Sequence, residues 1–232
     1  MKKWTEKQKR KVKRLIALVS AVTLIVILLL TGVLSVFHSI QEKQRDEKKA
    51  EKSLLVNVTQ PDIEVALLTP NVNSRPQIAI EQVKGIVIHY TANPGTDALA
   101  NRNYFEGKKN MEDEAKNKVS SHFIIGLDGK IIQCIPLDEI AYASNDRNKD
   151  TISIECCHPD KSGEFSDKTY AALVQLSAWL CGHYGLDEDA VIRHYDVTGK
   201  KCPKYYVKHE DAWKELKRDI FQEIERYRTL KN

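Results

Sequence analysis

The stretch Gly85-Ile86-Val87-Ile88-His89-Tyr90 decides the fold class of this chain of 232 residues. It is a short apolar run, rich in β-branched residues and preceded by charged and polar ones, and this pattern predicts a buried strand. Residues 151–156, Thr-Ile-Ser-Ile-Glu-Cys, have the same character and predict a second buried strand. Both runs carry an ionisable residue close to their carboxyl end.

Further elements are expected around these two strands. The Asp128-Gly129 pair is a strong turn signal between two apolar runs and predicts a hairpin over residues 121–135. Ser166 and Gly185 are a candidate N-cap and C-cap of a long helix whose apolar positions recur at steps of three and four residues. Three more elements are expected: helices over 97–105 and 208–228 and a strand over 191–193.

Strands that alternate with helices, together with one hairpin, predict an α/β domain over residues 80–232. Its expected architecture is a mixed central β-sheet flanked by helices.

A membrane-spanning helix is expected upstream of this domain. Residues 15–37 form an uncharged run of 23 residues rich in Leu, Ile and Val. At a rise of about 1.5 Å per residue the run would form about 34 Å of helix, which is enough for a hydrocarbon core of about 30 Å. A cleaved signal peptide fits less well, because its apolar region is usually about 7–15 residues long.

Charge is distributed unevenly along the chain. Residues 1–14 contain eight Lys and Arg residues against Glu6, whereas residues 80–232 contain 22 basic and 25 acidic residues. The positive-inside rule therefore predicts a basic cytoplasmic tip over 1–14, a single-pass anchor in the cell membrane and an extracytoplasmic domain. No nucleic-acid partner is expected, because the basic residues do not cluster on the domain.

Residues 38–79 are expected to form an extracytoplasmic stalk and linker. Residues 41–52 are almost entirely charged or amide residues, and Pro61, Pro70 and Pro76 interrupt the short apolar runs that follow. Such a composition is typical of a solvated spacer that leads into a folded domain.

Three residues of the domain have side chains suited to zinc. His89 ends the first predicted strand, His194 follows the strand at 191–193, and Cys202 comes eight residues later. Two imidazoles and one thiolate are good zinc ligands, and three protein ligands leave a fourth position for water. Zinc lowers the pKa of such a water, so that hydroxide becomes available to attack a carbonyl. Spacing alone leaves open the alternative that the histidines are simply packed or surface residues.

Five segments, in the same order, resemble the zinc-dependent N-acetylmuramoyl-L-alanine amidases, the superfamily of phage amidase endolysins and peptidoglycan recognition proteins. The segments are Val87-Ile88-His89-Tyr90-Thr91-Ala92-Asn93, Ser120-Ser121-His122-Phe123, Ile132-Gln133-Cys134-Ile135-Pro136, Thr151-Ile152-Ser153-Ile154-Glu155, and Arg193-His194-Tyr195-Asp196 through Lys200-Lys201-Cys202-Pro203. The resemblance spans roughly residues 83–215. It implies the amidase/peptidoglycan recognition protein-like fold, a zinc cofactor and peptidoglycan as the substrate.

The resemblance also implies roles for individual residues. His89, His194 and Cys202 fall on the zinc positions. Glu155 matches the acidic residue that many members use as general base, and Lys200 matches a lysine thought to stabilise the developing oxyanion. A carboxylate at this place would take a proton from the zinc-activated water and pass it to the leaving amine.

Two departures from the family pattern affect the expected site. Some relatives have a catalytic tyrosine just before the histidine of the second motif, where this chain has Ser121, so base catalysis is expected to fall on Glu155. His122 is then expected to contact a ligand or line the cleft, because a fourth ligand would close a catalytic zinc site. Similar members often carry a histidine where this chain has Ala143, while Tyr142 is either a cleft residue or a half-buried strand aromatic.

The four other cysteines, Cys134, Cys156, Cys157 and Cys181, are expected to be buried free thiols, although the expected compartment permits disulfides.

These observations predict a membrane-anchored N-acetylmuramoyl-L-alanine amidase that hydrolyses the amide bond between N-acetylmuramic acid and the L-alanine of the stem peptide. One alternative is a non-catalytic peptidoglycan-binding module, since recognition proteins of this fold lose a zinc ligand, usually the cysteine. Another is an assembly factor whose stalk recruits partners. The presence of both Cys202 and Glu155 favours the enzyme. The oligomeric state stays open.

Overall fold

The computed structural model of the chain describes residues 55–229, together with Val19, Leu30 and residues 32–34, 36–43 and 45. Two compact units are distinguished, Met1–Lys52 and Ser53–Asn232. In the first unit, residues 36–43 are helical and exposed, and His38 Nε2 lies 3.4 Å from Glu42 Oε1 one turn further on.

The predicted basic tip and most of the predicted membrane span, 15–37, lie outside the described residues. In the part of the chain that the structure describes, none of the helices combines the length and the apolar character needed to cross a bilayer.

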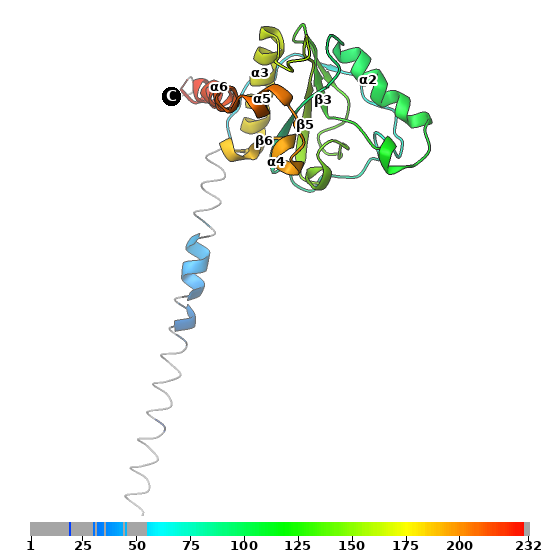
Figure 1. Cartoon of the computed structure of the whole chain (residues 1–232). Helices are drawn as coiled ribbons and strands as arrows, with labels where there is room; N and C mark the ends of the chain where they lie inside the picture. Colours follow the sequence, from blue (N-terminus) through cyan, green and yellow to red (C-terminus); the bar gives the residue numbers. More distant parts are fainter. Residues whose placement is uncertain are drawn as a thin grey trace, which may run out of the picture. The chain divides into compact units, whose positions relative to one another are not determined.

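A six-stranded sheet forms the central layer of the second unit (Figure 1). Its spatial order is β1-β4-β3-β5-β2-β6, with these bounds: β1 Ile63–Val65, β2 Gly85–Tyr90, β3 Phe123–Ile125, β4 Ile131–Gln133, β5 Thr151–Cys156 and β6 Val191–Arg193. Strands β3, β5, β2 and β6 are parallel, β4 is antiparallel to β3, and β1 is parallel to β4. The predicted mixed sheet with its hairpin is confirmed.

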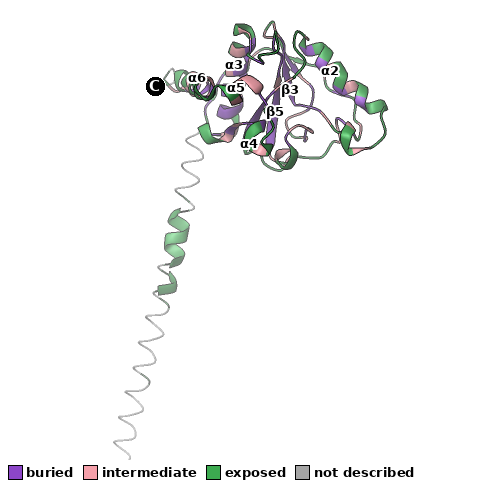
Figure 2. Ribbon diagram, in the orientation of Figure 1, coloured by how far each residue is buried: buried purple, intermediate pink, exposed green. Residues whose placement is uncertain are grey.

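Helices cover both faces of this sheet (Figure 1). Their bounds are α2 Ala98–Gly107, α3 Asp167–Tyr184, α4 His194–Thr198, α5 Lys204–Lys208 and α6 Glu210–Thr229, with 3-10 turns at Lys108–Asn110, Ala115–Asn117, Asn145–Arg147 and Glu188–Ala190. The larger core lies between the sheet and the pair α3 and α6, and it includes Ile88, Ile154 and Leu176. A smaller core on the α2 side includes Phe105 and Ile124. Strands β2, β3 and β5 are therefore buried on both faces, as Figure 2 shows, whereas the edge strand β1 is half-buried to exposed.

The caps predicted for the long helix are present in α3. The Ser166 hydroxyl accepts a hydrogen bond from the Thr169 backbone N–H at 3.2 Å, which satisfies one of the free donors of the first turn. Gly185 ends the helix in the left-handed conformation with φ of 66°, where a side chain would be strained. The closing helix predicted over 208–228 is present as α6, and His209 separates it from the short helix α5, which the sequence did not predict.

The folded unit begins upstream of the boundary expected at residue 80. Val56 and Val58 are buried against α3, and the Val56 backbone N–H donates to the Gly182 carbonyl at 2.9 Å. Strand β1 extends the sheet, and Arg75 forms two hydrogen bonds with the Glu139 carboxylate, at 2.9 and 2.8 Å. The segment 55–79 is therefore part of the domain and not a free linker.

Residues 55–79, called the lead-in segment below, contact α3, and this contact can be tested. A Cβ at Gly182 would lie 2.4 Å from the Val56 carbonyl oxygen, so Gly182→Ala must push the lead-in segment away. We expect this variant to lower the free energy of unfolding by about 1–3 kcal/mol in urea titrations, although alanine is the better helix former. Gly107→Ala is the matched control. This glycine has φ of −61° and nothing within 4 Å of the added Cβ, so the free energy should rise by about 0.4–1 kcal/mol. Equal stability of the two variants would contradict the packing of residues 55–58.

Candidate metal centre

The register of the parallel strands brings the candidate site residues to one edge of the sheet. His89 pairs directly with Glu155, so their side chains lie on the same face of β2 and β5. Ile88 pairs with Arg193, and His194 is the next residue after β6. The sheet therefore brings two imidazoles and one carboxyl group together from three strands.

Cys202 reaches this edge through the short helix α4. The helix ends at Gly199, whose φ of 76° is the left-handed conformation that glycine adopts without strain. The chain then turns back, and the Tyr195 backbone N–H donates to the Cys202 carbonyl at 2.9 Å. This return places the Cys202 sulfur beside the two histidines.

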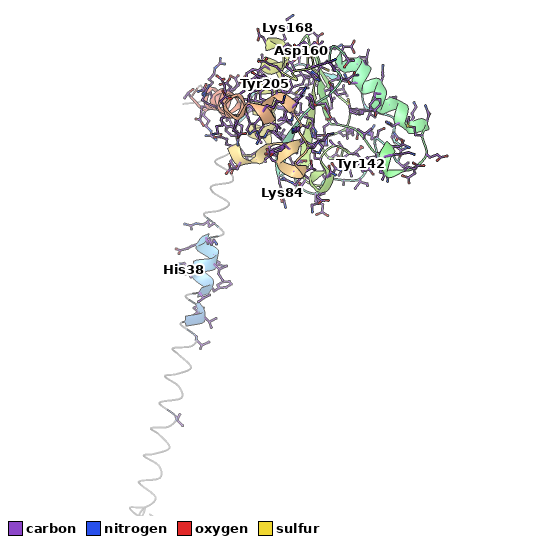
Figure 3. All side chains as sticks on the ribbon, in the orientation of Figure 1. His38, Lys84, Tyr142, Asp160, Lys168 and Tyr205 are labelled. Carbon is purple, nitrogen blue, oxygen red and sulfur yellow. The ribbon has the colours of Figure 1, made fainter. Side chains whose placement is uncertain are left out.

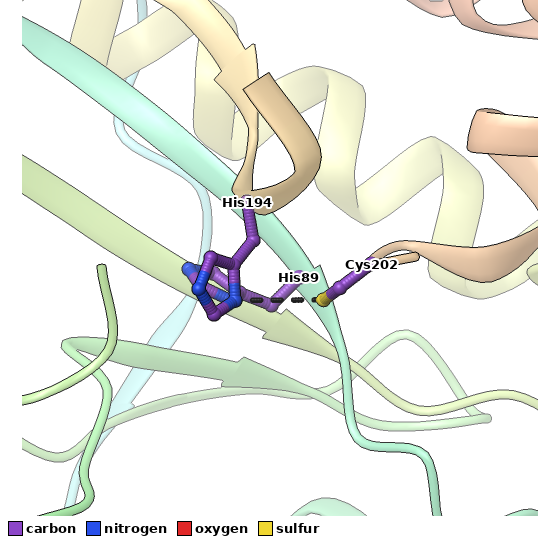
Figure 4. Close-up of side chains that lie close together, drawn as sticks. All are labelled: His89, His194 and Cys202. Carbon is purple, nitrogen blue, oxygen red and sulfur yellow. Dashed lines mark hydrogen bonds between the residues drawn. The ribbon is translucent and has the colours of Figure 1, made fainter. Parts of the chain in front are cut away.

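The three side chains converge closely, as Figure 4 shows. One donor atom from each of His89, His194 and Cys202 lies within 4.8 Å of the others, and all three residues are buried. The Cys202 sulfur is 3.8 Å from His89 Nδ1, and the two imidazole rings have centroids 4.7 Å apart. The structure thus joins all three residues that were predicted as ligands.

The chemistry of these donors fits a zinc ion. His194 Nδ1 is buried and has no hydrogen-bond partner among the described residues, which is unfavourable unless a ligand fills the position. Burial lowers the pKa of His89 and of His194, so both rings stay in the neutral form that binds metals. Burial also raises the pKa of the Cys202 thiol to about 12, so a cation is needed to hold it as thiolate.

Glu155 adds a carboxyl group next to this set. One of its oxygens, Oε2, is buried and makes no hydrogen bond within the described part of the chain. Burial raises the pKa of Glu155 to about 8, whereas the positive charge of Lys200 acts in the opposite direction. Lys200 itself has an exposed side chain, and its charge also lowers the pKa of both histidines. The two predicted catalytic residues are therefore electrostatically coupled to the candidate metal site.

His122 has a different setting from the expected one. Its ring is fully buried, Nδ1 accepts a hydrogen bond from the Ser153 backbone N–H at 3.0 Å, and Nε2 lies 2.9 Å from the Glu139 carbonyl. Burial lowers its pKa to about 4. This histidine connects β5 to the loop after β4. The arrangement favours a structural role and leaves neither ring nitrogen free for substrate.

Tyr142 is half-buried and lines a cavity of about 430 Å³ on the side of the domain that carries α2 and the turns after it (Figure 3). The opposite wall comes from the lead-in segment, and Lys118 stands over the tyrosine ring at 5.7 Å. None of the candidate metal ligands lines this cavity, so contact of Tyr142 with a substrate stays a prediction.

Two polar residues at the site were not anticipated. The Ser144 hydroxyl lies 3.2 Å from His89 Nε2, and Asn145 Oδ1 lies 3.3 Å from His194 Nε2. Their only signal in the sequence is that they lie two and three residues after Tyr142, and each of the two contacts spans about fifty residues of chain. The other four cysteines are buried free thiols, as expected.

Comparison with known proteins identifies the family. The sequence model of the N-acetylmuramoyl-L-alanine amidase family matches residues 80–205. N-acetylmuramoyl-L-alanine amidase CwlL of Bacillus licheniformis is 39% identical over 151 residues, which cover 59% of this chain and 40% of the relative. N-acetylmuramoyl-L-alanine amidase BlyA of Bacillus subtilis (strain 168) is 31% identical over 171 residues, which cover 65% of this chain and 44% of BlyA. The chain thus spans about two fifths of the length of these curated relatives.

Solved structures agree with the sequence matches. The structure of PlyL superposes with a TM-score of 0.58 at 25% identity, covering 69% of this chain and 97% of PlyL. The PlyG catalytic domain superposes with a TM-score of 0.58 at 26% identity, covering 70% of this chain and 94% of that domain. Since the family model matches more than half of the chain and spans His89, His194 and Cys202, the chain belongs to the N-acetylmuramoyl-L-alanine amidase family.

Proposed function

We propose that this chain is a membrane-anchored N-acetylmuramoyl-L-alanine amidase that cleaves the amide bond between N-acetylmuramic acid and the L-alanine of the peptidoglycan stem peptide. The observation that carries the proposal is the convergence of His89, His194 and Cys202 next to Glu155, whose Oε2 has no hydrogen-bond partner among the described residues. Family membership supplies the substrate class.

His89, His194 and Cys202 would hold the metal. When bound at three protein ligands, zinc lowers the pKa of a coordinated water and polarises the substrate carbonyl. The chain's own contribution is a dry pocket in which both imidazoles are neutral and already oriented.

Glu155 would act as the general base. A carboxyl group that burial holds at a pKa of about 8 is neutral at physiological pH, but a divalent cation nearby favours its ionised form. Glu155 then accepts a proton from the attacking water and returns it to the nitrogen of the leaving L-alanine. Within the part of the chain that the structure describes, Oε2 makes no hydrogen bond, so this oxygen is available for the transfer.

Lys200 would stabilise the carbonyl oxygen as it gains negative charge. Its ammonium group is exposed and already influences the pKa of Glu155 and both histidines, so it acts over the same small volume. Tyr142 would contact the substrate in the cavity that it shares with the lead-in segment.

Residues 15–37 would anchor the enzyme. The uncharged run and the eight basic residues before it support a single-pass helix with the N-terminus in the cytoplasm and the domain outside. Peptidoglycan lies on that side of the membrane, so the proposed topology and the proposed substrate agree.

The alternative of a non-catalytic binding module is less well supported. A receptor has no need of a complete ligand set, whereas all three ligand positions and Glu155 are present and converge.

Replacement of one ligand tests the metal site. We expect the parent chain to carry one zinc ion and Cys202→Ser to lose most of it, because a serine hydroxyl is a poor zinc ligand compared with a thiolate. Metal content is measured by native mass spectrometry. Cys181→Ala, a buried thiol in the larger core, is the control and should keep its zinc. Full zinc occupancy in Cys202→Ser would show that this sulfur is not a ligand.

Replacement of the carboxyl group separates base catalysis from metal binding. Glu155→Gln keeps the size of the side chain but cannot accept a proton, so we expect release of dye-labelled peptidoglycan to fall by about 10²–10⁴-fold with zinc content unchanged. The exposed carboxylate variant Glu188→Gln should behave as the parent. Cleavage by Glu155→Gln at the parental rate would remove Glu155 from the mechanism.

The anchor is tested by fractionation of cells. Two arginines at the centre of the run, Val26→Arg with Ile27→Arg, cost about 2.5–3.5 kcal/mol each in a bilayer, so the chain should move to the soluble fraction. The exchange Val26→Ile with Ile27→Val keeps the composition and should leave the chain in the carbonate-washed membrane pellet. Membrane retention of the arginine variant would rule out this span.

A further inference from the structure

We propose that Ser144 and Asn145 are positioning residues that orient both histidine ligands, so that one short loop determines how tightly the chain holds zinc. The inference rests on the proposed metal site and concerns side chains that do not themselves bind the metal.

One ring nitrogen of each histidine contacts this loop. His89 Nε2 lies 3.2 Å from the Ser144 hydroxyl, and His194 Nε2 lies 3.3 Å from Asn145 Oδ1. An amide oxygen can only accept, so the proton of His194 sits on Nε2 and the lone pair on Nδ1. That Nδ1 is the buried atom without a partner among the described residues. In His89 the nitrogen that does not face the loop is again Nδ1, which lies 3.8 Å from the Cys202 sulfur.

Each of the two hydrogen bonds therefore orients one of the two histidine ligands. Asn145 fixes the tautomer of His194, and Ser144, whose hydroxyl can donate or accept, fixes the orientation of the His89 ring. Both contacts turn Nδ1 toward the shared centre, which is how partners of metal-bound histidines raise affinity. The histidines come from separate elements, the end of β2 and the start of α4. Because Ser144 and Asn145 are neighbours in sequence, a single peptide unit sets the position of one ring relative to the other.

The loop itself is rigidly held. Asn148 Oδ1 accepts from the backbone N–H groups of Ala143 at 3.1 Å and Ser144 at 2.6 Å. The Arg147 N–H donates to the Ser144 carbonyl at 3.0 Å, and the Thr151 hydroxyl donates to the Arg147 carbonyl at 2.6 Å. Thr151 begins β5, the strand that carries Glu155. The loop is thus fixed to the same strand as the proposed base.

Asn145 has a backbone conformation that limits which residues can replace it. Its φ of 52° lies in the left-handed region, which asparagine, aspartate and glycine tolerate better than other residues. Glycine in place of Asn145 removes the side-chain acceptor without straining the backbone, and aspartate keeps an acceptor at the same place. This pair of substitutions separates the hydrogen bond from the conformation of the loop.

The test measures the zinc Kd of the full-length chain, purified in detergent, by competition with a chromogenic chelator. Ser144→Ala and Asn145→Gly should each raise the Kd by about 10–100-fold, whereas Asn145→Asp should stay within about threefold of the parent. Ala92→Gly is the matched control. Ala92 is exposed and has a φ of 54°, close to that of Asn145, so glycine removes the same backbone strain but takes away no side-chain hydrogen bond. Its Kd should not change. The thermal midpoint of each metal-free variant shows whether the fold is intact.

Zinc Kd values within about threefold of the parent in both Ser144→Ala and Asn145→Gly would overturn the proposal. A weakening in Asn145→Gly that Asn145→Asp does not restore would also overturn it, because the acceptor would then not be responsible. The measurement uses no substrate. A parent chain that binds zinc tightly but leaves peptidoglycan intact would contradict the proposed activity and leave this inference standing.

Discussion

Parallel pairing of β2 with β5 and β6 is the constraint on which the candidate site depends. The register sets His89 opposite Glu155 and puts His194 one residue beyond the pair formed by Ile88 and Arg193. Because all three strands end at the same edge, side chains that are up to 105 residues apart in sequence meet without any contribution from a long loop. The apolar residues that precede them, Ile86, Ile88, Ile152 and Ile154, are completely buried and hold this register in place.

The site contains polar groups whose burial is unfavourable. Glu155 Oε2 and His194 Nδ1 are buried without partners among the described residues, and Asn145 has a left-handed backbone. Each of these features is unfavourable for folding, and such features persist only where many other contacts hold the surrounding structure in place. Here the surroundings are two apolar cores on either side of the sheet, together with a loop fixed by Asn148. A bound cation would relieve both unpartnered atoms at once.

Local signals in the sequence predicted the parts of the fold that depend on neighbouring residues. The strands at 85–90 and 151–156, the Asp128-Gly129 hairpin and both caps of α3 are of this kind, and the structure has all of them. The three candidate ligands were identified because their residue types and order resemble those of a family. The partners Ser144 and Asn145 were not found, since a hydrogen-bond acceptor for a buried histidine can come from anywhere in the chain. The hydrogen-bond partners of His122, Ser153 and Glu139, were not predicted for the same reason, because they lie on different elements.

The lead-in segment was misjudged for a related reason, and its correct assignment changes how the proposed enzyme is tethered. Proline-interrupted apolar runs look like a spacer, yet Val56 and Val58 fill the core, and Arg75 pairs with Glu139. The Glu139 carbonyl in turn lies 2.9 Å from His122 Nε2, so the lead-in is linked to β5 and to the proposed base. Under the proposed anchor at 15–37, only residues 38–54 are left to act as tether. Seventeen residues reach at most about 60 Å when fully extended, and less where they are helical, as residues 38–43 are. Under that proposal, the length of the tether would limit the enzyme to the peptidoglycan nearest the membrane.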